Sequence, residues 1–336
     1  MSRLQTVGAG CGRGTTGRVM TNVLIILTHA ENVRQRYYDG IKARFPSITL
    51  NVVDHHSKAR PYLASADALL TFGTMTYDRL IDDAPRLRWI QALGTGIDGI
   101  TDLPSFRSDI AVTNIRGIHG APMSEAALVA MLALSRNLPR AIRAQDRHSW
   151  ERWPSRLLDH ATIGIFGIGA IAEALAPRCK ALGMTVVGIS SVKRTVAGFD
   201  RIFARDELLD AVRGLDFLVI LTPYSAETKN AVDETVFAAM KPSAYVINLA
   251  RGGVVDEGAL VKALDQERIA GAALDVFATE PLPADHPLWG RKNVVITSHL
   301  GGLYDRYVDD AMPTIEHNLR CFLADDMKGM INMVGH

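Results

Sequence analysis

The sequence predicts an α/β protein built from two doubly wound parallel sheets. From Asn22 onward, short apolar runs alternate with helical patterns, which is typical of strands and helices that pack around a parallel sheet. This alternation begins a second time at Thr162, after a long helical stretch. The length of 336 residues suits two domains, and an apolar fraction of 48% is enough for two cores.

The first half begins with a short apolar run that is typical of a buried strand. The elements expected there, in chain order, are a strand at Val23–Leu27, a helix at Glu31–Phe45, strands at Ile48–Val53 and Ala68–Phe72, a helix at Tyr77–Ala84 and a strand at Trp89–Leu93.

A long helix is expected between the two halves. Pro122 lies where the first helical turn would be, and proline is favoured there because its missing N–H would have no partner in the helix. The side expected to be buried is the apolar stripe Ala126, Leu128, Val129, Leu132, Leu134 and Leu138.

The second half repeats the pattern with more strands. Strands are expected at Thr162–Phe166, Thr185–Ile189, Phe217–Leu221, Tyr245–Leu249, Ala270–Val276 and Val294–Thr297. Helices are expected from the first of these strands to Leu182, through Leu208 and Val212, at Val232–Met240 and at Asp256–Asp265. A last helix, within Tyr304–Met327, is expected to fold back on the first half, because chain termini often lie close together.

Charge and cysteine content narrow the class of protein. The formal net charge is +1 with no block of like charge, so neither nucleic acid nor an anionic membrane is expected as a partner. Cys11, Cys179 and Cys321 are far apart, so we expect no disulfide framework, no metal site and a reducing, cytoplasmic location. The run Val23–Leu27 is far shorter than the roughly 20 residues that cross a bilayer. Residues 1–19 are expected to be a flexible extension.

Two segments match the G-x-G-x-x-[GA] pattern of dinucleotide-binding turns. Gly12–Gly17 follows no strand and opens no amphipathic helix, so we assign it to the N-terminal extension. Gly167–Ala172 follows a strand directly and opens a helix. In this context Gly167 permits a tight turn, Gly169 lets the backbone approach a pyrophosphate, and Ala172 allows close packing of helix and strand. The second segment therefore predicts a dinucleotide site.

The end of the following strand indicates which dinucleotide is preferred. A site for NAD usually carries Asp or Glu about 20 residues after the glycine turn, where it holds the ribose 2′-hydroxyl. Here the segment is Ser190-Ser191-Val192-Lys193-Arg194, which offers hydroxyl groups and two cations to a 2′-phosphate. The sequence predicts that NADP(H) is preferred and that NAD(H) remains possible, because the segment could also be a plain basic turn.

Three further polar segments each begin where a strand would end. They are Asn248–Asp256, Ala273–Pro281 and Thr297–Gly302. Ligands of doubly wound sheets bind outside the carboxyl ends of the strands, so these segments and the glycine turn should converge on one crevice.

At these residues the chain resembles the D-isomer-specific 2-hydroxyacid dehydrogenase family, and in particular its glyoxylate/hydroxypyruvate reductases. The resemblance runs from about Asn22 to the C-terminus and includes Leu93–Asp98 and Asn114–Glu125. It implies a Rossmann nucleotide-binding domain at 119–299, inserted into a flavodoxin-like substrate domain at 20–118 and 300–336. It also implies a homodimer, in which Trp150 and Trp153 either line the partner's pocket or pack in a dimer arm.

The family motifs imply a catalytic set of Arg251, Glu280 and His299. Reduction of a 2-oxo acid places negative charge on the carbonyl oxygen, and an imidazolium such as that of His299 can donate a proton to it near neutral pH. The Glu280 carboxylate would orient the imidazole and stabilise its charged form. Arg251 would offer a planar fork to the substrate carboxylate and carbonyl. Each residue type alone is more often structural, and only the three in family order indicate activity.

The same resemblance implies the remaining contacts. Leu93, Gly94, Thr95 and Gly96 would hold the substrate carboxylate through backbone N–H groups. Asp275 would contact the nicotinamide amide. The other implied cofactor contacts are Gly167, Gly169, Ala170, Ile171, Ser190, Ser191, Lys193, Arg194, Thr222, Pro223, Ala250 and Gly301.

Alternatives remain within and outside this chemistry. Ser298 stands where the family often has Pro, so the substrate stays open among glyoxylate, hydroxypyruvate and bulkier 2-oxo acids. A phosphoglycerate-type dehydrogenase without a regulatory domain is one alternative, and a non-catalytic dinucleotide-sensing protein is another. Formate dehydrogenases have Gln where Glu280 stands, which argues against that class. Short-chain dehydrogenases are disfavoured because Tyr38–Lys42, the Tyr-x-x-x-Lys match, precedes the glycine turn.

Overall fold

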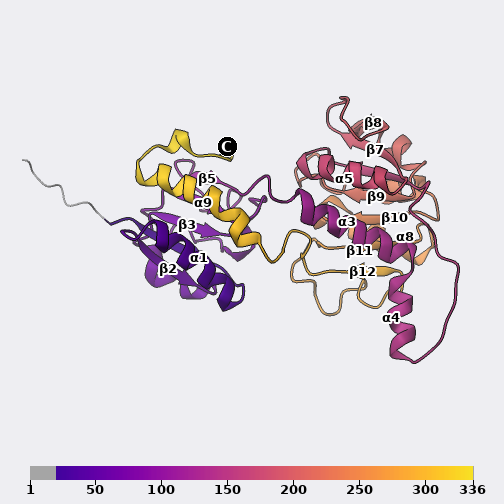
Figure 1. Ribbon diagram of the computed structural model, residues 1–336, viewed down its shortest axis with the longest axis horizontal. Helices are drawn as coiled ribbons and strands as arrows, with labels where there is room; N and C mark the ends of the chain where they lie inside the picture. The colour runs from indigo at the N-terminus through magenta and orange to yellow at the C-terminus, as the bar shows by residue number, and fades with distance from the viewer. Residues whose placement is uncertain (1–19, 336) are drawn as a thin grey trace, which may run out of the picture. The chain divides into compact units, whose positions relative to one another are not determined.

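The computed structural model describes residues 20–335, which form two α/β units (Figure 1). The first unit runs to Arg116 and resumes at Val308, and the second unit is Gly117–Tyr307. The sequence placed these junctions at 118/119 and 299/300. Residues 300–307 go with the second unit because the N–H groups of Leu300 and Gly301 bond to Asp275 and the Tyr307 hydroxyl bonds to His119. The expected extension and the first glycine match lie outside the described residues.

The described residues of the first unit, 20–116 and 308–335, contain a five-stranded parallel sheet in the order β2-β1-β3-β4-β5. This is the flavodoxin-like order. Its strands are β1 (Asn22–Ile26), β2 (Thr49–Val53), β3 (Ala68–Thr71), β4 (Trp89–Ala92) and β5 (Ala111–Thr113), and its α-helices are α1 (Glu31–Arg44), α2 (Arg60–Leu63) and α9 (Tyr307–Leu323).

The C-terminal helix α9 packs on the first unit. The ring centroids of Trp89 in β4 and Phe322 in α9 lie 5.3 Å apart. A Cβ atom on Gly40 of α1 would lie only 2.7 Å from the terminal methyl carbon of Met312, so the two helices are in close contact. The expectation that the last helix folds back on the first half is confirmed.

The helix predicted at Tyr77–Ala84 is wrong. The segment forms successive turns in which the N–H groups of Leu80 and Ala84 bond to carbonyls three residues back. Leu80, Ile81 and Ala84 are nevertheless buried in the core of the unit. The apolar pattern thus marked a buried segment but not its backbone conformation. Neither β5 nor α2 was predicted.

The second unit, described throughout Gly117–Tyr307, contains a seven-stranded parallel sheet in the order β12-β11-β10-β9-β6-β7-β8. The chain enters the sheet at the central strand β6 and adds β7 and β8 on one side. It then crosses to the other side of β6 and adds β9 to β12. The boundary between β6 and β9, where the strand order reverses, is the switch point of a Rossmann fold. The strands are β6 (Thr162–Phe166), β7 (Thr185–Ser190), β8 (Arg201–Ala204), β9 (Phe217–Ile220), β10 (Tyr245–Asn248), β11 (Gly271–Leu274) and β12 (Val294–Ile296). All but β8 were predicted.

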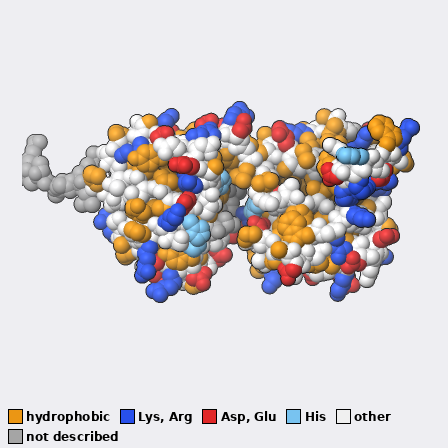
Figure 2. Space-filling view, turned by 90° about the horizontal axis from the view of Figure 1, so that it is seen from below, with side chains coloured by type: hydrophobic (Ala, Val, Ile, Leu, Met, Phe, Trp, Pro, Cys, Tyr) orange, Lys and Arg blue, Asp and Glu red, His pale blue; other side chains and the backbone are white. Residues whose placement is uncertain are grey.

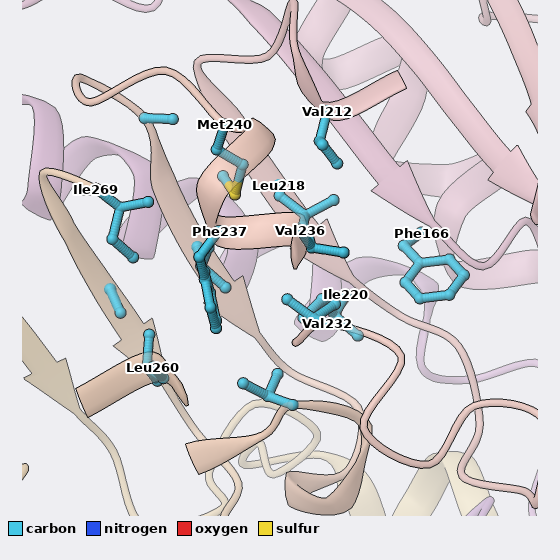
Figure 3. Packing of buried hydrophobic residues seen from close by; sticks show 14 of the residues in the cluster. Phe166, Val212, Leu218, Ile220, Val232, Val236, Phe237, Met240, Leu260 and Ile269 are labelled. Atoms are coloured by element: carbon cyan, nitrogen blue, oxygen red, sulfur yellow. The ribbon is translucent and has the colours of Figure 1, made fainter. Parts of the chain in front are cut away.

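Helices cover both faces of this sheet. The helices are α3 (Gly120–Ser135), α4 (Leu138–Asp146), α5 (Ala170–Ala181), α6 (Leu208–Val212), α7 (Glu234–Ala239) and α8 (Glu257–Asp265). In β9, Phe217 and Val219 point to the cluster under α3 and α5, whereas Leu218 and Ile220 point to the cluster under α6, α7 and α8. Figure 3 shows the second cluster, in which Leu218 and Ile220 face Val236 of α7. Burial on both faces is what a continuous apolar run predicts for a central parallel strand.

The stripe predicted to be buried on the long helix is partly wrong. Val129 and Leu132 of α3 are 64% and 44% exposed, and Leu138 of α4 is 48% exposed. The packed side of α3 is instead lined by residues including Ala127 and Ala130. Small side chains let α3 approach α5 closely. The larger apolar side chains remain on the surface of the single chain.

The surface carries mixed charge. Figure 2 shows acidic and basic side chains interspersed over the face that it presents. Within residues 20–335, no helix combines the length and the apolar character needed to cross a membrane.

Candidate active site

The glycine turn after β6 has two glycines with different roles. Gly167 has a φ of +103°, and a Cβ atom there would lie 2.5 Å from the backbone nitrogen of Thr222. By contrast, no described residue other than its two chain neighbours has an atom within 4 Å of a Cβ on Gly169. No side chain of the described chain caps α5, which begins at Ala170. The open space and the uncapped N–H groups fit the pyrophosphate of a dinucleotide.

The other predicted cofactor residues of this region lie around the turn. Thr222 is buried against Gly167, and Pro223 follows it in an exposed position. Ala170 is exposed and Ile171 is half-buried in the first turn of α5. The chain therefore brings the predicted residues at the ends of β6 and β9 to one place.

The segment after β7 places two cations next to carboxylates that the sequence analysis missed. Ser190 is half-buried, and Ser191, Lys193 and Arg194 are exposed. The Lys193 ammonium lies 3.1 Å from Glu207. The Arg194 guanidinium lies 3.2 Å from Glu173 of α5 and 3.4 Å from the carbonyl oxygen of Ile168, within the glycine turn. Because the partners come from separate elements, no local pattern could have indicated them.

Arg251 lies in the loop after β10, and the side chain of Asn248, the last residue of that strand, fixes the loop. The Asn248 side chain accepts the Ala250 N–H at 3.1 Å and donates to the Arg251 carbonyl at 2.9 Å. A Cβ on Gly252 would lie 1.8 Å from the carbonyl carbon of Phe277, so only glycine lets this loop pass against the loop after β11. Ala250 is buried at the same turn.

Glu280 and His299 form a hydrogen-bonded pair. The Glu280 Oε2 atom lies 2.7 Å from His299 Nδ1, and Oε1 accepts the Phe277 N–H at 2.9 Å. Partial burial acts to raise the pKa of Glu280, but the bonds from His299 and Phe277 and the nearby charge of Arg251 lower it overall. Glu280 is therefore ionised at neutral pH and can orient a protonated imidazole.

Asp275 holds the loop that carries His299. Its carboxylate is 2% exposed and accepts the N–H groups of Leu300 at 2.8 Å and Gly301 at 2.9 Å. It also accepts the hydroxyl of Thr297, and its backbone carbonyl accepts the His299 N–H at 2.8 Å. The backbone of His299 has a φ of +55°, a conformation that is uncommon for residues other than glycine. The buried carboxylate stabilises this conformation, a role that the sequence analysis did not foresee.

His119 lies behind the same loop and was also missed. Its Nε2 atom lies 3.2 Å from the Tyr307 hydroxyl, and burial lowers its pKa to about 4. A Cβ on Gly302 would lie 3.5 Å from the His119 ring. Because the histidine is separated from the loop by about 180 residues, no motif connects the two.

The predicted substrate loop, Leu93–Gly96, belongs to the first unit. It follows β4, and the Leu93 N–H bonds to the carbonyl of Thr71 in β3 at 2.8 Å. The Thr95 hydroxyl donates to the Ile115 carbonyl at 3.1 Å. These bonds fix the loop at the carboxyl ends of the strands of its own sheet.

The second unit thus brings Arg251, Glu280, His299, Asp275 and Gly301 together at the carboxyl ends of β10, β11 and β12. Within residues 20–335, no group of three His, Cys, Asp or Glu side chains could hold a metal ion.

Comparison with protein families decides the assignment. Residues 128–301 match the family described as D-isomer specific 2-hydroxyacid dehydrogenase, NAD binding domain. The chain belongs to the D-isomer specific 2-hydroxyacid dehydrogenase family. The matched range covers the glycine turn and His299, so the second unit contains the dinucleotide-binding domain of the family. The predicted fold class and family are confirmed.

Individual members of the family are similar over most of the chain. A glyoxylate reductase of Aeropyrum pernix is 36% identical over 256 residues, which are 72% of this chain and 74% of that protein. A D-3-phosphoglycerate dehydrogenase of Methanocaldococcus jannaschii is 30% identical over 276 residues, 81% of this chain. The match spans only 52% of that relative, about half of its length.

A solved structure shows the same fold. The D-isomer specific 2-hydroxyacid dehydrogenase of Xanthobacter autotrophicus, in complex with NADPH and MES, matches with a TM-score of 0.78 and 26% identity. The match covers 94% of this chain and 98% of that chain.

Proposed function

We propose that the protein reduces a small 2-oxo acid to the D-2-hydroxy acid, with His299 as the proton donor. The observation that carries this proposal is the 2.7 Å hydrogen bond between Glu280 Oε2 and His299 Nδ1. Within the described residues, His299 Nε2 has no hydrogen-bond partner, so it is available to a substrate. The glyoxylate reductase relative makes glyoxylate the first substrate to test, and the family resemblance of the sequence adds hydroxypyruvate.

The three side chains have separate tasks in this mechanism. Arg251 binds the substrate carboxylate and carbonyl through its planar guanidinium. A nicotinamide dinucleotide held at the glycine turn would supply the hydride. As the carbonyl oxygen gains negative charge, His299 donates the Nε2 proton to it. Glu280 fixes the ring through Nδ1, so that the proton that leaves is the one on Nε2. The backbone of Leu93–Gly96 holds the substrate carboxylate.

The cofactor is proposed to be NADP(H) in preference to NAD(H). No acidic residue follows β7 at Ser190–Arg194, where a carboxylate would repel a 2′-phosphate. Lys193 and Arg194 are paired with Glu207 and Glu173, but both pairs are largely exposed, and exposed pairs contribute little stability. A dianionic phosphate can therefore replace the carboxylates. The cofactor contacts proposed are Gly167, Gly169, Ala170, Ile171, Ser190, Ser191, Lys193, Arg194, Thr222, Pro223, Ala250, Asp275 and Gly301.

The functional form is proposed to be a homodimer in the cytoplasm, without nucleic acid or membrane as a partner. Val129 and Leu132 of α3, Ile142 of α4 and Trp150 are 64%, 44%, 50% and 94% exposed. A group of exposed large apolar side chains is typical of a protein interface. The balanced charge supports the absence of a nucleic-acid or membrane partner, and the low cysteine content supports a cytoplasmic location.

The test is oxidation of NADPH and of NADH, followed at 340 nm, with glyoxylate, hydroxypyruvate, pyruvate, 2-oxobutyrate, phenylpyruvate and 3-phosphohydroxypyruvate. We expect turnover with a small 2-oxo acid and a higher kcat/KM for NADPH. His299→Ala should lower kcat by ~100-fold or more while the affinity for NADPH stays nearly unchanged. Equal kcat/KM values would refute the cofactor preference.

Other results of the assay distinguish the alternatives. Activity confined to 3-phosphohydroxypyruvate would indicate a phosphoglycerate-type dehydrogenase. Binding of NADPH without turnover of any substrate, together with unchanged binding in His299→Ala, would favour a dinucleotide-sensing protein. Unchanged turnover in His299→Ala would remove this residue from the role of proton donor.

A further inference from the structure

A cavity lies at the amino ends of the strands in the second unit, opposite to the ends that carry the proposed catalytic residues. Its volume is about 430 Å³, which is within the range of small-molecule sites. It is lined by Tyr245, Ala270 and Asn293, which are the first residue of β10 and the residues directly before β11 and β12. Arg251, Glu280 and His299 follow the other ends of these strands. With a rise of ~3.3 Å per residue, the amino and carboxyl ends of the four-residue strand β10 lie about 10 Å apart.

The lining of this cavity has an excess of positive charge. Four cations, Arg140, Arg143, Arg147 and Lys292, share the lining with one carboxylate, Glu151. The two oxygens of Glu151 accept bonds of 2.9 Å from Arg140 and Arg147. These bonds hold the pKa of Glu151 below its usual range, so the carboxylate stays charged and fixes both guanidinium groups.

The other two cations of the cavity have no carboxylate partner among the described residues. Arg143 donates to the carbonyl oxygen of Lys292 at 3.1 Å and forms no ion pair there. Lys292 is exposed, and its ammonium forms neither an ion pair nor a hydrogen bond within residues 20–335. Two other cations near these strand ends have carboxylate partners, since Arg291 pairs with Asp265 at 2.6 Å and Lys241 with Asp216 at 3.0 Å. Arg143 and Lys292 therefore leave the cavity with an excess of positive charge.

The arrangement of α4 separates this cavity from the exposed apolar surface. Arg140, Arg143 and Arg147 are spaced i, i+3 and i+7, and so they lie on one face of the helix. Leu138 and Ile142, at 48% and 50% exposed, lie about half a turn away. A second copy that covered the apolar face would leave the basic face open to a small ligand.

We propose that the cavity lined by Arg140, Arg143, Arg147 and Lys292 binds a compact multivalent anion, a phosphorylated or polycarboxylate small molecule. Guanidinium groups recognise both chemistries through paired N–H donors. Arg140 and Arg147 are already held in place by Glu151, and Arg143 and Lys292 supply the uncompensated charge. The site is separate from the proposed catalytic residues and does not depend on their function.

The test is calorimetric titration of the full chain with pyrophosphate and, separately, with citrate, in the presence of saturating NADPH. Pyrophosphate represents a phosphorylated ligand and citrate a polycarboxylate. We expect saturable binding of at least one, weakened ~10-fold or more in the double variant Arg143→Gln with Lys292→Gln, since two charged contacts are lost. The control Lys262→Gln removes an exposed cation from α8 and should bind as the wild type does.

Three outcomes would overturn the proposal. The first is the absence of saturable binding of either anion below about 10 mM. The second is equal binding by the wild type and the double variant, which would place the anion elsewhere, including the glycine turn. The third is a double variant that light scattering finds monomeric while the wild type is dimeric, which would make the cavity a contact between subunits. Normal NADPH binding by the double variant would show that it is folded.

Discussion

Two loops at the carboxyl edge of the same sheet are held in different ways. The glycine turn after β6 has its shape because Gly167 has no side chain, and the backbone of Thr222 occupies the space where a Cβ would lie. The loop that carries His299 has its shape because the buried Asp275 carboxylate accepts two backbone N–H groups and a hydroxyl. One loop depends on steric exclusion and the other on buried hydrogen bonds. The two should therefore respond to different substitutions.

The largest effect is expected from Gly167→Ala. The new Cβ would meet backbone atoms 2.5 to 2.6 Å away at a φ of +103°, and backbone cannot move aside as a flexible side chain can. We expect a loss of about 3 kcal/mol or more in the free energy of unfolding, measured by urea denaturation.

Gly169→Ala is the matched control, because open space surrounds that position in the described chain. It should change stability by less than about 1 kcal/mol and should weaken NADPH binding. Equal stability of the two variants would show that the contact with Thr222 does not fix the turn.

Asp275→Asn should have the next largest effect. An amide can replace only part of the acceptor capacity of the carboxylate, so one buried N–H of the loop loses its partner, at a cost of about 1–3 kcal/mol. We expect kcat to fall ~10-fold or more because His299 is displaced, with a smaller rise in the KM for NADPH because Asp275 is also a proposed cofactor contact.

The control for this variant is Asp285→Asn, an exposed position on the same unit. A rise in the KM for NADPH with an unchanged kcat would show that Asp275 contributes only the cofactor contact and does not hold His299.

The His299 loop should also be the more sensitive to pH. His119 is neutral in the folded chain because burial lowers its pKa to about 4 from the ordinary 6.5. Below pH 6.5 the unfolded chain takes up a proton that the folded chain does not, so stability is highest above pH 6.5 and falls as the pH drops toward 4.

Between pH 7.5 and pH 5 this residue should lower the free energy of unfolding by about 2 kcal/mol. His119→Gln removes the ionisable group, so its urea-unfolding free energy should fall less over the same range. An identical pH dependence of wild type and variant would contradict the burial of a neutral ring.

The smallest effect is expected from Lys193→Gln beside the glycine turn. Loss of one cation near the 2′-phosphate should lower kcat/KM for NADPH ~5-fold to 10-fold and leave that for NADH unchanged. Lys180→Gln is the matched control, since Lys180 is also exposed and forms an equivalent pair with Asp200 at 2.8 Å. If both variants lower kcat/KM for NADPH equally, the effect comes from overall charge rather than from the site.

The amino-acid sequence by itself determined most strands of the two sheets, though not β5 and β8, and it indicated the proposed catalytic set. Buried strands such as β9 are continuous apolar runs, so they could be recognised from the sequence. Arg251, Glu280 and His299 each follow such a strand in the chain, so their position at the carboxyl ends of the sheet could also be predicted. The glycine turn was equally visible, because its strand and helix adjoin it in the chain.

Only the tertiary structure decided how these residues are held and paired. The bonds from Asp275 to the His299 loop, the placement of His119 behind that loop, and the pairs of Lys193 and Arg194 each join residues from separate elements. The structure also decided that Val129 and Leu132 face outward, because the small residues of α3 pack on α5. A local sequence pattern indicates the secondary structure that one segment favours, whereas packing and buried hydrogen bonds depend on which segments come into contact in the fold.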